Sequence, residues 1–324
     1  MNSLSTSQLS IAGTEDLGGG LKASFVINSN ITGVSGTAFG DRDRFVALEG
    51  NFGSVRIGKF APDAAKNFHA QSAAVSVNQG SLYGLTSTSS TSGPRFATFT
   101  AGSFERNDGN VEFKSPSFGG FTVSANYGTS KSDDSTLAGE ANTTQSGLGL
   151  AYANGPLSIS AGLNTRDADT QFVAASNSTT TPVITTAAVA DSKVKADLNW
   201  IGASYDLGVA KLFATNVSRK DKTTANTGVQ TTNADVNVTA LGVSVPVNAF
   251  TFNATFYTGK DKAPALSTGE NKLSGYQLSA RYAMSKRTSL YALIGENEVK
   301  RDGGNTTSIA RKDTLSAVGI VHTF

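Results

Sequence analysis

Histidine, cysteine and clustered carboxylates are the residues most able to carry chemistry, and this chain has few of them. It has two histidines and no cysteine. His69 has no second histidine or carboxylate cluster near it in sequence to complete a metal site. Neither His69 nor His322 belongs to a recognisable nucleophile arrangement, and no Lys-Ser/Thr pair follows the glycine run at 18–20 as in a phosphate-binding loop. We therefore expect a protein that is not an enzyme and that needs no metal or other cofactor.

The composition narrows the remaining classes. A net charge of +2 over 324 residues argues against a nucleic-acid-binding protein. The apolar fraction of 38% is low for a soluble chain, and glycine is abundant with 34 residues. No apolar run approaches the roughly eighteen residues that a membrane-spanning helix needs. The opening residues, MNSLSTSQLSIAG, carry no Lys or Arg ahead of an apolar core, so they do not form a signal peptide.

Apolar residues alternate with small or polar ones along much of the chain, which is the period of a β-strand. The clearest segments are PLSISAGLNT (156–165), GFTVSANYG (120–128) and AFTFNATFY (249–257). The chain ends in the same way, because Val318, Ile320, His322 and Phe324 share one face of the final segment. The second face of these segments carries Ser, Thr, Asn and Gly rather than many Lys and Glu, which suits a crowded, wet interior.

Connections between these segments alternate in length. Short turns are expected at residues 16–20, 51–53, 116–120, 154–156, 206–208, 246–249 and 284–286. Longer polar stretches are expected at 32–41, 129–142, 167–192, 221–232, 260–270 and 301–311. Short turns on one rim and long loops on the other predict an all-β fold, a transmembrane antiparallel up-and-down β-barrel formed as one domain by residues 1–324. We count about fifteen strands, and since bacterial barrels of this kind have even strand numbers, we expect the first strand to be missing from this chain.

One connection departs from this rhythm. Residues 61–94, between GSVRIGKF and the next strand, mix apolar and polar residues and show no clear period. A loop of this length inside a compact fold usually has a function.

Five segments of the chain together resemble the general diffusion porins of Gram-negative bacteria, and the betaproteobacterial family in particular. They are GTEDLGGGLKASF (13–25), VALEGNFGSVRIGKF (46–60), NVEFKSPSFGGFTVSANYG (110–128), RYAMSKRTSLYALIG (281–295) and the ending AVGIVHTF. The resemblance implies an outer-membrane barrel of the sixteen-stranded type, assembled as a homotrimer. It further implies passive diffusion of small hydrophilic solutes past a constriction, with residues 61–94 folded inward as the third outer loop.

The same resemblance assigns residues to that constriction. Lys59 and Arg106 fall on basic wall positions of the family, Arg42 matches a further arginine, and Arg44 is an additional one. Gln8 stands where the family has an arginine. The inward loop holds one carboxylate, Asp63, against Lys66 and His69, with Arg95 at its exit. Since a narrow channel strengthens the field of a ring of one sign, we expect a preference for small anionic solutes, with neutral ones also passing.

Strand parity conflicts with one of these assignments. Lys59 shares a face with Val55 and Ile57, which is the face expected to contact lipid. It can line the pore only if the strand ends or bulges near Gly58.

The expected partners follow from the outer-membrane location. They are outer-membrane lipid, lipopolysaccharide and the barrel-assembly machinery, the last acting through Phe324, while His322 and Phe324 are expected at the membrane interface. No nucleic-acid partner is expected. A substrate-specific porin stays open as an alternative, as does an outer-membrane barrel enzyme; an adhesive β-protein would not account for the alternation of short and long connections.

Overall fold

The computed structural model describes residues 7–31, 39–65, 106–132, 141–170, 176–177, 185–186, 192–262, 270–302 and 311–323. Almost all of them are in β-strands. The first half of the chain forms β1 (Gln8–Gly18), β2 (Leu21–Asn30), β3 (Arg44–Gly50), β4 (Gly53–Phe60), β5 (Asn107–Lys114), β6 (Phe121–Ser132), β7 (Ala141–Asn154) and β8 (Leu157–Thr170). The second half forms β9 (Ser176–Asn177), β10 (Thr185–Thr186), β11 (Ser192–Asp206), β12 (Lys211–Ala225), β13 (Gln230–Val247), β14 (Phe250–Asp261), β15 (Glu270–Ala283), β16 (Thr288–Asp302) and β17 (Arg311–His322).

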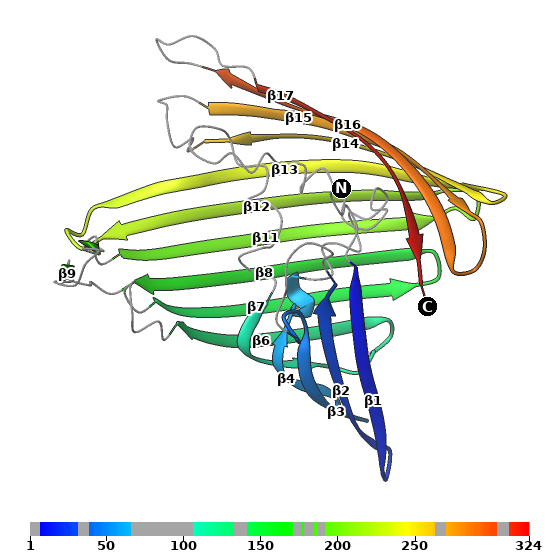
Figure 1. Ribbon diagram of the computed structural model, residues 1–324, viewed down its shortest axis with the longest axis horizontal. Coiled ribbons are helices and arrows are strands. Elements are labelled where there is room, and N and C mark those ends of the chain that lie inside the picture. Colours follow the sequence, from blue (N-terminus) through cyan, green and yellow to red (C-terminus); the bar gives the residue numbers. More distant parts are fainter. Residues whose placement is uncertain are drawn as a thin grey trace.

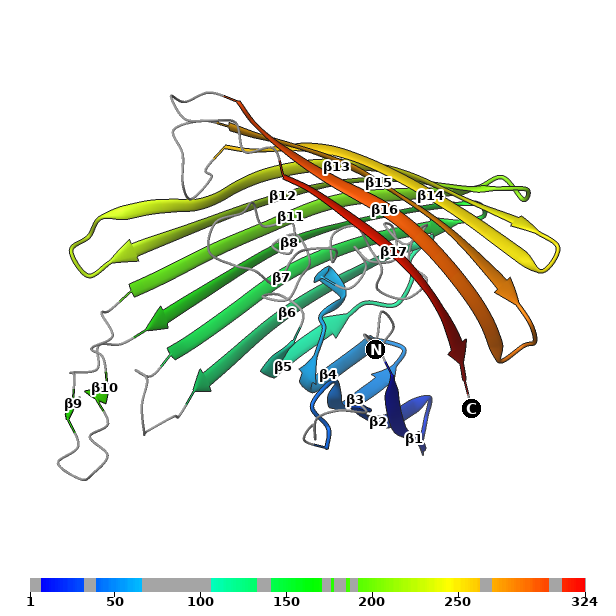
Figure 2. The ribbon, with the colours of Figure 1, turned by 45° about the horizontal axis from the view of Figure 1, so that its top comes forward.

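Fifteen of these strands form a single antiparallel sheet in which neighbours in sequence are neighbours in space, apart from the β9–β10 hairpin inserted between β8 and β11. Figures 1 and 2 show that the sheet is strongly curved and that the helical turn after β4 lies on its concave side. Within the described residues, β1 and β17 form the two edges of the sheet. The predicted up-and-down antiparallel fold is confirmed.

The two faces of the sheet differ in the way that the alternation predicts. On β17, Val318 and Ile320 are 82% and 63% exposed on the convex face. On β11, Ala196, Leu198 and Trp200 are almost fully buried on the concave face. A continuous face of exposed apolar side chains along many neighbouring strands is typical of a surface in contact with lipid. The convex face is therefore the membrane face, and the concave face encloses the interior.

The connection predicted as a long loop at 221–232 is instead part of two strands. β12 continues to Ala225 and β13 begins at Gln230, with a tight turn held by the Gly228 N–H donating to the Ala225 carbonyl at 2.9 Å. The β-branched threonines on both sides of the turn extend the pairing, which passes a register shift at Asp221/Lys222. The loop was predicted because this segment is polar. Paired strands can also be polar where they extend beyond the membrane into water, so the prediction was wrong.

Within the ranges given above, no helix is long and apolar enough to cross a membrane.

Candidate functional site on the inner wall

The five residues after β4 turn back along the concave face instead of continuing outward. The Ala65 N–H donates to the Pro62 carbonyl at 3.0 Å, which closes one helical turn over residues 62–65. The Ala64 carbonyl then accepts hydrogen bonds from the Trp200 indole N–H at 2.7 Å and from the Asn164 amide at 3.3 Å. Trp200 and Asn164 belong to β11 and β8, so this segment crosses the inner wall from β4 to strands far along the sheet.

Glycines on the inner wall make that crossing possible. A Cβ on Gly162 would collide with the Ala64 carbonyl oxygen, and one on Gly149 would lie 3.1 Å from the Ala64 Cα. A Cβ on Gly147 would lie 3.2 Å from the Ala64 Cβ. Each site therefore lets the backbone of residues 62–65 lie directly on the sheet, which is the usual reason for glycine at a close backbone approach. We name residues 61–65 the root segment.

An ion-pair cluster fixes the first part of the root segment. Arg56 donates to Glu112 through Nε at 2.9 Å and Nη2 at 2.5 Å, and Nη2 also lies 2.5 Å from the Asp63 carboxylate. Lys114 Nζ lies 2.8 Å from the second Asp63 oxygen, and the Asp63 backbone N–H donates to Glu112 at 2.6 Å. The Arg56 guanidinium also lies 4.4 Å from the centre of the Phe60 ring. Two cations thus match two carboxylates, so the cluster holds the segment without adding net charge.

Asp63 therefore has a role that its place in sequence did not show. We expected it as the single carboxylate of an inward loop. Its side chain is only 10% exposed and is bound by both Arg56 and Lys114, so it acts as an anchor at the start of the connection.

Lys59 and Arg44 come together on the other face. They are directly paired across β3 and β4, next to the Val46–Ile57 pair, and Val46 and Ile57 are 60% and 53% exposed. Both cations bind Asp108, at 3.0 Å from Lys59 and 3.2 Å from Arg44. The register shift between Gly58 and Phe60 lies in the pairing with β5 and leaves Phe60 buried on the inside with Arg56. Strand parity thus keeps Lys59 on the membrane side, near the loop end of its strand, and this placement gives no support to a role for Lys59 or Arg44 in the constriction.

The other predicted wall residues gather near the ends of β1, β2 and β3. Gln8 is paired with Asn30, whose amide oxygen accepts a hydrogen bond from Arg42 at 3.0 Å. Arg106 donates from Nε to Asp43 at 2.6 Å. Asp41 accepts from the Asn30 backbone N–H at 2.7 Å, and this bond, together with the Asn30 side-chain amide, holds the pKa of Asp41 below its usual range.

Several predicted sites lie outside the described residues. They are Lys66, His69, Arg95 and Phe324, together with most of the 61–94 connection. His322 is described: it is exposed at the end of β17, and its Nδ1 lies 2.8 Å from the Thr288 hydroxyl. Its assignment to the membrane interface stays a prediction.

Sequence reasoning missed two groups on the inner wall. One group is the anchors Arg56, Glu112 and Trp200. The other is Arg166 on β8, which shares the concave face with Asn164 and donates to the Thr143 hydroxyl at 3.5 Å. Arg219 on β12 is paired with Asp221 at 2.7 Å, whereas among the described residues no ion pair to a carboxylate is formed by Arg166. Alternation alone could have placed Arg56 and Arg166 on the inside, since each alternates with residues that face the membrane.

Metal chemistry finds no support in the described part of the chain, where no group of three or more His, Cys, Asp or Glu side chains could hold an ion. A sheet with an apolar exterior, a polar interior and a connection that enters that interior is the architecture of an outer-membrane channel.

Comparison with known proteins assigns the family. The family model described as Gram-negative porin matches residues 1–302, so the chain belongs to the Gram-negative porin family. Outer membrane porin protein 32 of Delftia acidovorans is 30% identical over 292 residues, which are 89% of this chain and 73% of that relative. The solved structure of an anion-selective porin from Comamonas acidovorans is 27% identical, with a TM-score of 0.70 over 100% of this chain and 91% of that one. The trimer form of OmpT from Vibrio cholerae shares the fold, with 14% identity and a TM-score of 0.65 over 98% of this chain and 90% of that one. This chain is accordingly an outer-membrane channel for passive diffusion of small hydrophilic solutes and not an enzyme.

Proposed function

We propose that this porin prefers anions and that the preference comes from inner-wall arginines that exceed the carboxylates near the root segment. The observation that carries the proposal is the pairing of charges there. Asp63 and Glu112 are matched by Arg56 and Lys114, and the Asp43 and Asp221 carboxylates are bound by Arg106 and Arg219. Arg166 shares this wall, and among the described residues its one hydrogen-bond acceptor is the neutral Thr143 hydroxyl, so it contributes positive charge to the interior.

The position of Arg166 strengthens this effect. It lies two residues along β8 from Asn164, which binds the root segment. Field lines from a charge inside a narrow channel with low-dielectric walls cannot spread into bulk water, so the charge acts on passing ions more strongly than at an open surface. The solved Comamonas relative, described as anion-selective, supports the same direction.

The constriction is proposed to be formed by the connection 61–94. What supports it is the root segment, which enters the interior and is bound on both sides by side chains of the wall. The wall opposite is proposed to include Arg106 and Arg42, with Gln8 as an uncharged member. The proposed constriction does not require Lys59, Arg44 or Lys66.

Assembly as a homotrimer in contact with outer-membrane lipid and lipopolysaccharide is part of the proposal. The trimeric form of the OmpT fold relative supports the trimer. Recognition of Phe324 by the barrel-assembly machinery is likewise proposed.

The test is the zero-current potential across a planar bilayer that separates two KCl concentrations. We expect the sign for chloride preference in the parent protein and a smaller potential in Arg166→Gln. A unit charge about 10 Å from an ion in water changes its energy by about 0.4 kcal/mol, with opposite signs for chloride and potassium, so the chloride-over-potassium ratio should fall about fourfold, and roughly fifteenfold in Arg166→Glu. Lys193→Gln is the matched control, because Lys193 lies at an exposed strand end and is paired with Asp169 at 3.2 Å. An unchanged ratio in Arg166→Glu would remove the arginine from the account, and a cation-selective parent would overturn the proposal.

A further inference from the structure

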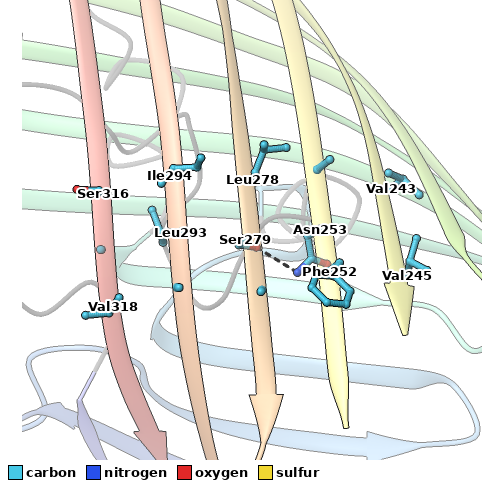
Figure 3. A pocket seen from close by; sticks show the side chains of 14 residues that line it. Val243, Val245, Phe252, Asn253, Leu278, Ser279, Leu293, Ile294, Ser316 and Val318 are labelled. Atoms are coloured by element: carbon cyan, nitrogen blue, oxygen red, sulfur yellow. Dashed lines mark hydrogen bonds between the residues drawn. The ribbon is translucent and has the colours of Figure 1, made fainter. Parts of the chain in front are cut away.

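An apolar groove runs along the membrane face of β13–β17. It consists of two adjoining hollows with volumes of about 720 and 630 Å³, which share Ala280, Ala292 and Val318. Ala280 and Ala292 are paired across β15 and β16, and Ala292 is paired with Val318 across β16 and β17. These small side chains form the floor of the groove, and larger ones form its walls: Phe252, Leu278 and Ile294, shown with Val318 in Figure 3.

The groove leads toward the end of the barrel that carries the short turns. Its lower hollow is lined by Phe250, Tyr282 and Leu290, and the Phe250 and Tyr282 ring centres are 4.8 Å apart. Aromatic rings gather at the two interfaces of a membrane barrel, and short turns lie on the periplasmic side. The groove therefore extends from the apolar zone to the periplasmic interface.

A basic turn stands at that end of the groove. Lys286 and Arg287 lie between β15 and β16, directly after the strand that carries Tyr282 and before the one that carries Leu290. Both residues are exposed, and in the described part of the chain neither side chain forms an ion pair, while the Arg287 backbone carbonyl accepts from the Thr323 N–H at 2.9 Å. Two cations thus lie at the membrane interface, free to bind an anion.

We propose that this groove is a binding site for a phospholipid of the periplasmic leaflet. One acyl chain lies over Ala280 and Ala292, and the phosphate binds Lys286 and Arg287. An acyl chain that moves from the surrounding lipid into the groove gains little hydrophobic free energy, because both environments are apolar. The groove therefore contributes only close packing with the chain, and the two cations of the turn account for binding in preference to bulk lipid. A phospholipid carries a phosphate for the two cations and an apolar tail for the groove. A second copy of the protein would have to present both an acidic group and an apolar side chain to the same two places.

The test is native mass spectrometry of the full-length protein extracted from outer membranes in mild detergent. Phosphatidylglycerol or phosphatidylethanolamine is added at fixed ratios, and bound lipid is counted per protomer. We expect one retained phospholipid in the parent protein and at least a severalfold loss of retention in Ala280→Phe, which fills the floor. The double variant Lys286→Gln/Arg287→Gln should lose retention to a similar degree without any change in the apolar surface.

Matched controls separate these effects from general ones. Ala125→Phe places the same ring on the membrane face of β6, away from the groove, and Lys22→Gln removes a cation from the end of the β1–β2 hairpin. Both should retain lipid as the parent protein does, and single-channel conductance should be unchanged in all variants. Equal retention in parent, Ala280→Phe and the double glutamine variant would overturn the proposal. Loss of the oligomer in Ala280→Phe would overturn it as well, since the groove would then be a subunit contact.

Discussion

The inner walls formed by β3–β5 and by β8 with β11–β16 face the same interior but are built from different side chains. On β4 and β5 the inner positions carry Arg56, whose side chain is 16% exposed, together with the buried Glu112, Asn107 and Asn110. On β11–β16 the inner positions form an apolar cluster with Leu198, Trp200, Val217, Val236, Val238, Ala240, Tyr257, Leu273 and Val299, and Ala65 of the root segment belongs to it. We call the first the ionic wall. The second, the apolar wall, meets the root segment mainly through that apolar cluster, although buried polar residues such as Arg219 and Gln277 share its face.

This difference shows how a connection can be fixed inside a water-filled barrel. Ion pairs and backbone hydrogen bonds are directional, so the β4–β5 wall sets the position of Asp63. Apolar burial is not directional, and the opposite wall supplies only contact area together with two donors to one carbonyl. We therefore expect the ionic wall to decide where the root segment lies and the apolar wall to decide how firmly it stays there.

The largest effect should follow from breaking the ionic wall. Arg56→Met leaves Glu112 as a buried carboxylate without its cation, and the loss of one partner of a buried pair costs about 3–5 kcal/mol. We expect the root segment to detach, with a changed mean conductance and noisier open states in single-channel recordings.

The control for that variant also replaces Glu112 by glutamine, which has the same shape but no charge. Arg56→Met/Glu112→Gln is neutral and still offers an acceptor for the Asp63 N–H. It should recover most of the parent conductance. A double variant as noisy as the single one would show that the charge pairing is not what fixes the segment.

A smaller effect is expected from crowding the apolar wall. Gly162→Val places a side chain where the Ala64 carbonyl now lies, and overpacking of this kind costs about 1–3 kcal/mol. The conductance should shift to a new stable level, because the ionic anchors still hold Asp63. Ala161→Val, one residue away on the membrane face, should leave the conductance at the parent value.

The smallest effect should come from a single donor. Trp200→Phe keeps the apolar ring but removes the N–H that binds the Ala64 carbonyl, at a cost of about 0.5–1.5 kcal/mol. Asn164 remains as a donor at 3.3 Å. We expect unchanged conductance at room temperature, with a lower temperature for the onset of open-state noise. A change as large as that of Arg56→Met would reverse the ranking of the two walls.

Sequence alone predicted the faces and most turns of this fold because alternation is a local property. Val318 and Ile320 lie outside and Leu198 and Trp200 inside, as the period of two requires. The same alternation places Lys59 on the membrane side, whereas the family resemblance had placed it on the pore wall.

The anchors could not be predicted, because they depend on distant register. Arg56 meets Glu112 because the two residues are directly paired across β4 and β5, which are joined by a connection of more than forty residues. Trp200 meets Ala64 across 136 positions of sequence. Contacts of this kind depend on the register in which the strands pair, and that register cannot be derived from a single sequence.

The position of the root segment across the inner wall is the central claim, and a cross-link tests it most directly. The chain has no cysteine, so the pair Ala64→Cys/Gly147→Cys can be oxidised without competing thiols. A Cβ at position 147 lies 3.2 Å from the Ala64 Cβ, slightly closer than the usual disulfide spacing of about 3.5–4.5 Å, and the Asn126 and Asn164 side-chain amides that it also meets must shift to admit it. The measurement is the fraction of disulfide by mass after mild oxidation of the folded protein, with Ala64→Cys/Ser204→Cys as the control pair. We predict near-complete cross-linking of 64 with 147, none with 204, and a conductance that oxidation leaves unchanged. Free, alkylatable thiols at both 64 and 147 in the folded channel would contradict the account.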